Sequence, residues 1–462
     1  MIFAFVVVLI AFALFLYVLG LDIPGTWKFA VSVAEMIVVG QVLSMKYNLG
    51  ASWGLILFRT KKGLDIIASL AKHEKFWSFF AEVGTLMSYG ALSFIFMRKS
   101  VSRNSAIVGF ILLLFLALFV SAPVLGFLAV NVKGALPNQD ALSSGATESA
   151  TRSIDGFLLL WFALLLGGGM FFVLLASILM YGVVVLSALS STVFSGTTAI
   201  QDTNPGATFL LPGINIPFIE GIIALLVILV VHEGAHAVLG KMARVPILSS
   251  GVVLFGVIPV GAFVEPDEDY LKRIEKTKQT RVLVAGSTAN LITSVITFII
   301  FVGFMLSAFA LNLNERGLLV ATGDASGTLQ KGDMIYKLNG EDALGYKNIS
   351  IPKNSSVSLL TNHGDISLKT NIDGKMGITF YPLSGGSLIF AKFKYGFLDF
   401  IYLTLGLIFA LNFVVGTINL LPLPFFDGYR ILELNAPHPI VAKALMVITL
   451  IAFLMNFVPW LF

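Results

Sequence analysis

Residues 222–241 read IIALLVILVVHEGAHAVLGK and combine a long apolar run with three polar residues of catalytic type. The run is long enough to cross a bilayer as a helix, which takes about 20 residues. Its second half carries His232, Glu233 and His236. Residues four apart lie above one another on a helix, so the two histidines can present their imidazoles to one metal ion. Glu233 can then reach a water molecule beside that ion, as in the His-Glu-x-x-His motif of zinc proteases.

The apolar surroundings of this motif argue against a chance arrangement on a core helix. A charged side chain inside a membrane-spanning helix costs about 3 kcal/mol, so such residues are rarely without a role. We therefore interpret His232, Glu233 and His236 as part of a hydrolytic metal site.

The composition indicates an all-α polytopic membrane protein. Of the 462 residues, 57% are hydrophobic and 12% are charged, whereas soluble domains carry about 25% charged residues. Apolar runs of helical length predict about eight to nine spans. The candidates are residues 2–21, 28–45, 78–97, 106–132, 156–190, 218–240, 282–310, 396–421 and 439–461. The net charge of +4 fits basic loops beside a membrane and does not indicate nucleic-acid binding.

The chain divides into four predicted parts. Residues 1–205 form an N-terminal transmembrane region with a basic cytoplasmic loop at 46–77. Residues 206–311 form the first part of a catalytic membrane core, and residues 386–462 form its second part. Between them, 312–385 is less apolar and contains short β-like runs, which predicts a small inserted β-rich domain.

Two features of the N-terminal region interrupt its helices. Residues 134–155 are rich in Ser, Ala and Thr, which predicts a polar loop. The run 156–190 is too long for one upright helix and too short for two, and we expect Gly167–Gly169 either to kink it or to let a neighbouring helix approach closely.

The segment GVVLFGVIPVGAFV, residues 251–264, is too short and too rich in Gly and Pro to span as a helix. Non-helical backbone at membrane depth survives only where protein covers it or where it lines a cavity. Its β-branched residues favour strands. We predict a re-entrant β-loop beside the metal site, with a strand edge that could hold an extended substrate by main-chain hydrogen bonds.

Two histidines do not complete a catalytic zinc site, which needs three protein ligands and a water. The chain has no cysteine, so the third ligand must be a histidine or a carboxylate. The three remaining histidines, His73, His363 and His438, lie in other regions of the chain.

Asp427 is the leading carboxylate because it stands at the end of an apolar span. Pro422 and Pro424 must interrupt the helix just before it. Two alternatives stay open at this point. Asp427 can be an ordinary capping residue at a helix end, or Glu265 and the acidic run after it can supply the ligand.

These motifs resemble the site-2 protease family of intramembrane zinc metalloproteases, and most of all its archaeal members, over about residues 205–462. The resemblance rests on His232-Glu233-Gly234-Ala235-His236, Gly251–Glu265 with the Glu-Pro-Asp-Glu run, Ala285-Gly286-Ser287-Thr288-Ala289-Asn290, and Asn419 to Gly428. Ser287 stands where the family usually has proline, and Phe426 where it usually has leucine. Neither change removes a ligand.

The resemblance implies a zinc metalloendopeptidase that hydrolyses peptide bonds in or near transmembrane helices of membrane protein substrates, as in regulated intramembrane proteolysis. It implies zinc ligation by His232, His236 and Asp427, with Glu233 as the general base. Asn419 would bond the substrate backbone, and Asn290 would help to line the site, although Asn290 can equally form a helix–helix hydrogen bond.

Many members of this family carry a PDZ domain where this chain has residues 312–385. The runs Gly327–Ile335 and Leu338-Asn339-Gly340 resemble the turns and strand of such a domain. The resemblance therefore implies a PDZ-like insertion, with transmembrane proteins and the lipid bilayer as partners. It says nothing of the oligomeric state or of the particular substrate.

Two other classes of function remain compatible with the sequence. One is a membrane-embedded zinc protease of another lineage, with a glutamate as third ligand, that cleaves juxtamembrane loops. The other is a non-enzymatic transporter or scaffold whose intramembrane polar residues serve ions or helix contacts.

The basic residues predict the orientation in a cell membrane. Lys241 and Arg244 follow the motif helix, and 265–281 is also rich in lysine and arginine, so both segments should be cytoplasmic. The active site then lies toward the cytoplasmic side, and the span 282–310 carries 312–385 to the outside.

This orientation can be measured by cysteine accessibility, because the chain has no native cysteine. A thiol reagent that does not cross membranes should label Lys347→Cys from outside intact cells. It should label Lys276→Cys only after the membrane is opened. The reverse pattern would overturn the orientation.

Overall fold

The computed structural model describes most of the chain. The described residues are 2–23, 25–47, 51–52, 54–60, 64–97, 100–132, 154–208, 210–322, 327–330, 332–348, 353–372, 374–383 and 391–462. They form two compact units, one of Met1–Phe298 with Thr404–Phe462 and the other of Ile299–Leu403. The predicted polar loop at 134–155 falls almost wholly outside the described residues.

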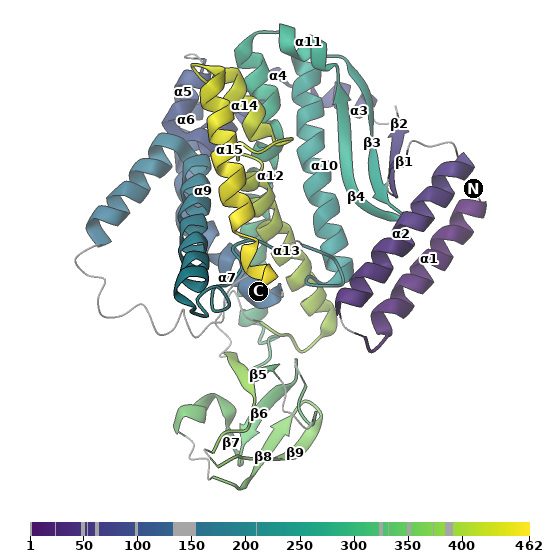
Figure 1. Cartoon of the computed structure of the whole chain (residues 1–462), viewed down its shortest axis with the longest axis vertical. Coiled ribbons are helices and arrows are strands. Elements are labelled where there is room, and N and C mark those ends of the chain that lie inside the picture. The colour runs from purple at the N-terminus through teal and green to yellow at the C-terminus, as the bar shows by residue number, and fades with distance from the viewer. Residues whose placement is uncertain are drawn as a thin grey trace. The chain divides into compact units, whose positions relative to one another are not determined.

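The first unit consists mainly of apolar helices (Figure 1). Its helices are α1 (Ile2–Gly20), α2 (Gly25–Tyr47), α3 (Leu64–Leu70), α4 (Glu74–Tyr89), η1 (Gly90–Leu92), α5 (Ser93–Phe96), α6 (Arg103–Phe115), the π-helical turn η2 (Leu116–Val120), α7 (Ser121–Asn131), α9 (Ile154–Ser195), α10 (Phe218–Met242), α11 (Glu268–Arg273), α14 (Asp427–Asn435), α15 (Pro439–Met455) and η4 (Val458–Leu461). Two more helices connect the units, α12 (Lys276–Ala310) and α13 (Gly396–Ile418).

Six helical segments of the described chain are long and apolar enough to cross a membrane. They are Glu74–Phe96, Arg103–Ala129, Leu159–Ser195, Phe218–Met242, Lys276–Ala310 and Gly396–Ile418. Shorter apolar segments occur at Phe3–Val18 in α1 and Pro439–Met455 in α15. The structure thus supports a polytopic helical protein, and the count of eight to nine spans stays a prediction.

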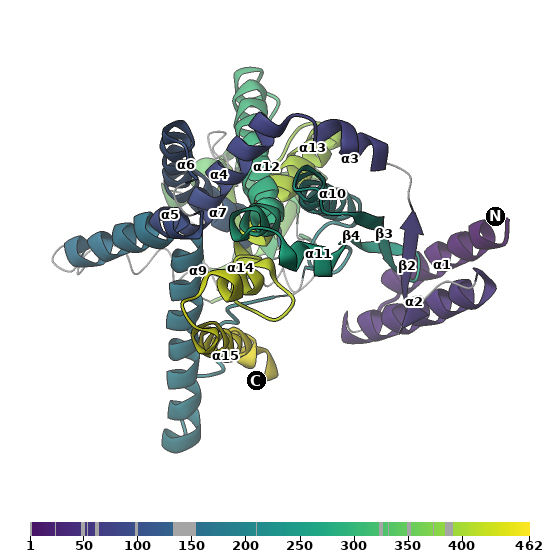
Figure 2. The ribbon, with the colours of Figure 1, turned by 90° about the horizontal axis from the view of Figure 1, so that it is seen from above.

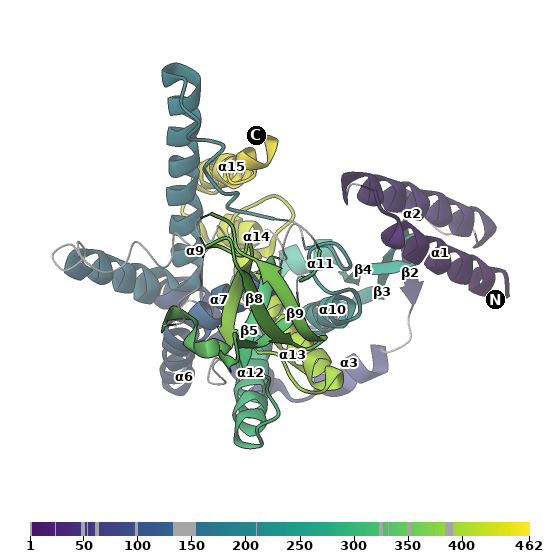
Figure 3. The same ribbon diagram turned by 90° about the horizontal axis from the view of Figure 1, so that it is seen from below.

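The predicted kink is confirmed at Gly169 in α9. This residue has φ 64° and ψ −157°, so the helical hydrogen bonding breaks there and the two arms of α9 run in different directions (Figures 2 and 3). A side chain at this position would also meet the backbone of Ser88 and Gly90 at 2.6 Å. Glycine is required here on both counts.

A four-stranded antiparallel sheet lies beside α10 and includes the segment predicted as a re-entrant loop. Its order is β1 (Ala51–Ser52), β2 (Leu55–Thr60), β3 (Ile247–Phe255) and β4 (Ile258–Pro266). The β3–β4 hairpin accounts for the predicted β-loop, although its depth in a membrane stays a prediction. β2 covers one edge of β3, so β4 forms the other edge of the sheet, next to α10 (Figures 1 and 2).

β2 is a strand that the sequence did not reveal. It pairs with β3 from Leu55 opposite Phe255 to Thr60 opposite Ser250. The run Leu55–Phe58 was interpreted as part of a basic amphipathic loop, because lysines and arginines surround it on both sides. Its pairing partner lies almost 200 residues away, so local pattern alone could not identify it.

Small residues bring the helices of the metal-binding region close together. A side chain at Gly84 in α4 would overlap Thr288 of α12, and one at Gly416 in α13 would meet Asn290 at 3.1 Å. The Ser294 hydroxyl also donates to the carbonyl of Phe409 at 2.8 Å. Helices in membranes approach closely at such small residues, and α12 therefore packs directly between α4 and α13.

A buried ion pair joins three further elements of this unit. The Arg281 guanidinium lies 2.8 Å from Glu82 Oε1. The other carboxylate oxygen of Glu82 accepts hydrogen bonds from the Ser102 N–H at 3.0 Å and the Ser105 hydroxyl at 2.7 Å. The contact fixes α4, the N-terminus of α6 and the first turns of α12 to one another.

The second unit contains a six-stranded sheet that the β-like runs of the sequence had predicted. Its strands are β5 (Gly317–Thr322), β6 (Met334–Leu338), β7 (Glu341–Asp342), β8 (Ser356–Thr361), β9 (Gly364–Lys369) and β10 (Thr379–Leu383), with the short helix η3 (Ala343–Asn348). The order is β10-β5-β6-β8-β9, and β7 pairs with β6. A buried apolar cluster that includes Leu318, Ile335 and Leu359 forms its core. Its likeness to a PDZ domain stays a prediction.

Candidate metal centre

The structure brings together His232, His236 and Asp427. The two histidines lie one turn apart on α10, and Asp427 is the first residue of α14, 191 residues beyond His236. Their ligand atoms all lie within 4.8 Å of one another. Among the described residues, a search for clusters of at least three His, Asp or Glu side chains that could hold a metal ion finds these three.

The break between α13 and α14 delivers Asp427 to this position. α13 ends at Ile418, and the chain then turns through Pro422 and Pro424. The Gly428 N–H closes the turn by donating to the carbonyl of Asn419 at 2.8 Å. A side chain on Gly428 would overlap the backbone carbonyl of Leu420. The two prolines and this glycine thus explain why the helix stops and restarts with Asp427 in its first turn.

Two residues of α12 orient the histidine rings. The His236 Nδ1–H donates to the carbonyl of Val282 at 2.8 Å. The side-chain amide of Asn290 lies 3.1 Å from His232 Nδ1, while the Asn290 oxygen is buried without a partner. Because the two ends of an amide can be exchanged, the satisfied arrangement has His232 Nδ1–H donating to that oxygen. Both histidines then present the lone pair of Nε2 to the same point.

The three atoms at this point fit a zinc ion. His232 Nε2 and His236 Nε2 lie 3.2 Å apart, and Asp427 Oδ2 lies 3.1 Å from His236 Nε2 and 3.4 Å from His232 Nε2. With the tautomers fixed by Val282 and Asn290, three electron pairs face one another and repel unless a cation lies between them. Ligands about 2.0–2.1 Å from a tetrahedral zinc would be about 3.3 Å apart. Imidazole nitrogen and carboxylate oxygen are also donors that zinc prefers.

Gly286 of α12 leaves the space that such an ion needs. A Cβ at this position would overlap His232 Nε2 and would crowd His236 Nε2 at 2.5 Å. The glycine of the Ala285–Asn290 motif is therefore required sterically, because any side chain at Gly286 would collide with the two histidines. α12 must therefore be free of a side chain where the two imidazoles converge, one turn before Asn290.

Glu233 lies between the metal centre and the sheet. Its Oε2 accepts a hydrogen bond from the backbone N–H of Val264 in β4 at 3.1 Å. Within the described residues, no hydrogen bond is found for its other oxygen, Oε1. Glu233 is therefore held by one oxygen and can exchange a proton through the other.

The remaining candidates lie outside this cluster. Glu265 accepts a hydrogen bond from the Ser249 hydroxyl at 2.5 Å and lies 3.5 Å from Arg59 Nε. The carbonyl of Asn419 joins the turn before Asp427, and its half-buried side chain makes no hydrogen bond within the described residues. The three other histidines occur at the N-terminus of α4, in a pair with Asp333, and at the N-terminus of α15.

Two backbone groups of this site could not be identified from the sequence. They are the Val282 carbonyl that holds His236 and the Val264 N–H that holds Glu233. Any residue supplies these groups, so no residue type marks them. The sequence did predict Asn290, whose side chain lies 3.1 Å from His232 Nδ1, and its role at the site stays a prediction.

Comparisons with known proteins agree with this geometry. The sequence model described as peptidase family M50 matches residues 220–459. The chain is also similar to an uncharacterized protein of the archaeon Methanocaldococcus jannaschii, with 32% identity over 253 residues, 53% of this chain. The chain covers 64% of that relative's length. No solved structure matches the chain.

The metal centre predicts opposite effects for two carboxylates. Asp427→Ala should lose bound zinc, because two imidazoles alone leave the ion without its third protein ligand. Glu265→Ala should keep about one zinc per chain, since Glu265 contacts Ser249 and Arg59 instead. Metal content of the purified variants, measured by elemental analysis, distinguishes the two. Retained zinc in the Asp427 variant would contradict this centre.

The steric role of Gly286 has a matched control on α10. Gly286→Ala should weaken zinc binding at least tenfold, because the new methyl group occupies the convergence point of the histidine nitrogens. Gly234→Ala lies within the His-Glu-x-x-His motif but has open space at its Cβ, so it should bind zinc as the native chain does. Competition with a zinc chelator measures both affinities. Equal affinities would show that the space at Gly286 is not needed.

Proposed function

Because the chain belongs to peptidase family M50, the site-2 protease family of membrane metallopeptidases, we propose that it is a zinc endopeptidase that cleaves membrane proteins. Its scissile bonds would lie within or next to transmembrane helices of the substrates. The convergence of His232, His236 and Asp427 on one point is the observation that carries this proposal.

The donor set matches the cofactor of the family. His232 and His236 would hold zinc through Nε2, and Asp427 would hold it through a carboxylate oxygen. When bound, zinc supplies a Lewis acid that polarises a carbonyl group and makes water a stronger acid. A competing centre with a glutamate as third ligand has no support, because Glu265 is engaged elsewhere.

Glu233 would carry the protons of the hydrolysis. As general base it takes a proton from the attacking water, and as general acid it passes that proton to the leaving amine. The Val264 N–H steadies the carboxylate by one oxygen and leaves Oε1 for this exchange. Such a residue must be close to the metal ligands without being one of them, and Glu233 meets both conditions on α10.

The edge of β4 is suited to hold the substrate in an extended form. A helical segment hides its carbonyls in hydrogen bonds and must unwind before attack. β4 pairs with β3 on one side only, and the Val264 N–H faces Glu233 and not β3. An unwound segment could therefore pair along this edge of β4, close to Glu233.

Asn419 and the protein's placement complete the proposal. The side chain of Asn419 is free to bond the substrate backbone near the turn that carries Asp427. The substrates would be transmembrane proteins in a cell membrane, with the active site toward the cytoplasmic side, as the basic residues after α10 predict. Zinc-dependent cleavage of a membrane protein by the purified chain would distinguish this function from that of a transporter or scaffold.

Substitution of the general base separates chemistry from metal binding. Glu233→Gln should lower the rate of cleavage of a membrane substrate at least about a hundredfold, because an amide cannot take the proton. Zinc should stay bound, because Glu233 is not a ligand. Glu220→Gln at the start of α10 makes the same chemical change far from the metal and should cleave normally. A Glu233→Gln variant with native activity would refute the mechanism.

A further inference from the structure

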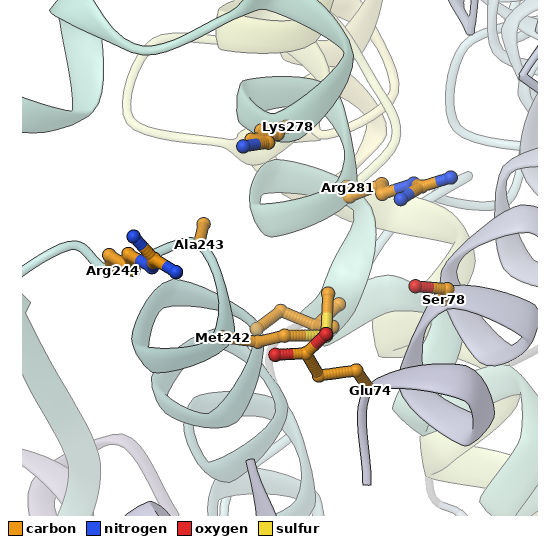
Figure 4. Close-up of a pocket in the computed structure, with 8 residues that line it drawn as sticks. Glu74, Ser78, Met242, Ala243, Arg244, Lys278 and Arg281 are labelled. Atoms are coloured by element: carbon orange, nitrogen blue, oxygen red, sulfur yellow. The ribbon is translucent and has the colours of Figure 1, made fainter. Parts of the chain in front are cut away.

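A cavity of about 360 Å³ lies where three candidate spans meet (Figure 4). The C-terminus of α10 and the N-terminal turns of α4 and α12 form its wall. The lining residues are Glu74, Ser78, Leu239, Met242, Ala243, Arg244, Lys278 and Arg281. None of them is a metal ligand or part of the proposed catalytic site. Helix ends of this kind meet the lipid headgroups when the helices cross a bilayer.

Cationic side chains dominate the polar part of the wall. Arg244, Lys278 and Arg281 face a single carboxylate, Glu74, among the described lining residues. Within the described residues, neither Arg244 nor Lys278 forms an ion pair. Arg281 is paired with Glu82, yet its Nε–H is buried without an acceptor. The cavity is therefore lined by two cations, Arg244 and Lys278, that have no ion-pair partner within the described residues.

The first turns of α12 carry this charge at the less favourable end of the helix. They contain Lys276 and Lys278, and the acidic Glu275 stands just before them, with its carbonyl accepting from the Gln279 N–H at 3.0 Å. A helix N-terminus is the positive end of the helix dipole, so cations there destabilise it and an anion is attracted to it. An anion bound beside Lys278 would balance the charge of that side chain.

Arg244 adopts a backbone conformation that costs a side chain energy. It follows the C-cap Ala243 of α10 with φ 64°, where glycine is the usual residue. Its side chain lines the same cavity as Lys278 (Figure 4). A glycine would suit the backbone better, whereas the arginine charge suits the C-terminal end of the α10 dipole.

We propose that this cavity binds a phosphate group, and that an anionic membrane lipid supplies it. Arg244 and Lys278 would hold the phosphate oxygens. Met242, which is partly buried, lines the same cavity and would contact the apolar part of a lipid. Glu74 would accept a hydrogen bond from a headgroup hydroxyl. A free phosphate ion shares the charge but could not use the apolar wall.

Lipid binding to the full-length protein in a neutral detergent tests this site. Native mass spectrometry should show tighter binding of dioleoylphosphatidylglycerol than of dioleoylphosphatidylcholine. The double variant Arg244→Gly with Lys278→Gln should bind phosphatidylglycerol about twenty-fivefold more weakly, because each basic residue near an anionic lipid surface contributes about fivefold. Lys272→Gln with Arg273→Gln removes the same charge from exposed positions of α11 outside the cavity and should bind as the native chain does.

Two further measurements test whether the variants still fold and whether the bound phosphate belongs to a lipid or to a free ion. Without lipid, Arg244→Gly should unfold at no lower temperature than the native chain, since glycine prefers this φ. Earlier unfolding would assign Arg244 a structural role and count against the site. Inorganic phosphate should displace phosphatidylglycerol only weakly. Full displacement at millimolar phosphate would assign the site to a soluble anion, and equal lipid binding by both double variants would overturn the proposal.

Discussion

The structure depends on the convergence of three electron-rich atoms, two histidine nitrogens and one aspartate oxygen, on a single point. His232 and His236 contribute from α10, and Asp427 contributes from α14, with no N–H between them once the ring tautomers are fixed. This arrangement is repulsive by itself and becomes favourable with a divalent cation. The fold must therefore hold the two helices together by other contacts.

α12 supplies most of those contacts. The carbonyl of Val282 accepts a hydrogen bond from His236, and the side chain of Asn290 contacts His232. Between these two contacts, Gly286 leaves space for the rings of both histidines. The same helix lies close to α13 through Gly416, and α13 leads to the turn before Asp427. A single helix thus sets the ring orientations, the space and the distance of the third ligand.

The sequence predicted those parts that depend on residue type and local spacing. His232 and His236 were predicted from polar residues that are costly in an apolar helix, Asp427 and Asn290 from the resemblance to a family, and the interruption at Gly169 from a run of glycines. The role of Glu233 as general base stays a prediction. The hairpin of β3 and β4 followed from Gly and Pro within an apolar run. By contrast, β2 and the Val264 N–H depend on pairing between distant segments, and backbone groups carry no residue signature. The number of spans depends on the lipid surroundings of each helix, which hydrophobicity alone does not determine.

The ion pair between Glu82 and Arg281 has a consequence for how the chain is made. The two residues are 199 positions apart, so at about 5–20 residues per second the ribosome needs about 10–40 s to supply the arginine after the glutamate. Glu82 belongs to the first candidate span and enters the membrane without that partner. Ser102 and Ser105 arrive soon after it and already donate two hydrogen bonds to its carboxylate. The serines can act as temporary solvation for an acid that waits for its cation, so that the early helices stay inserted until α12 is synthesised.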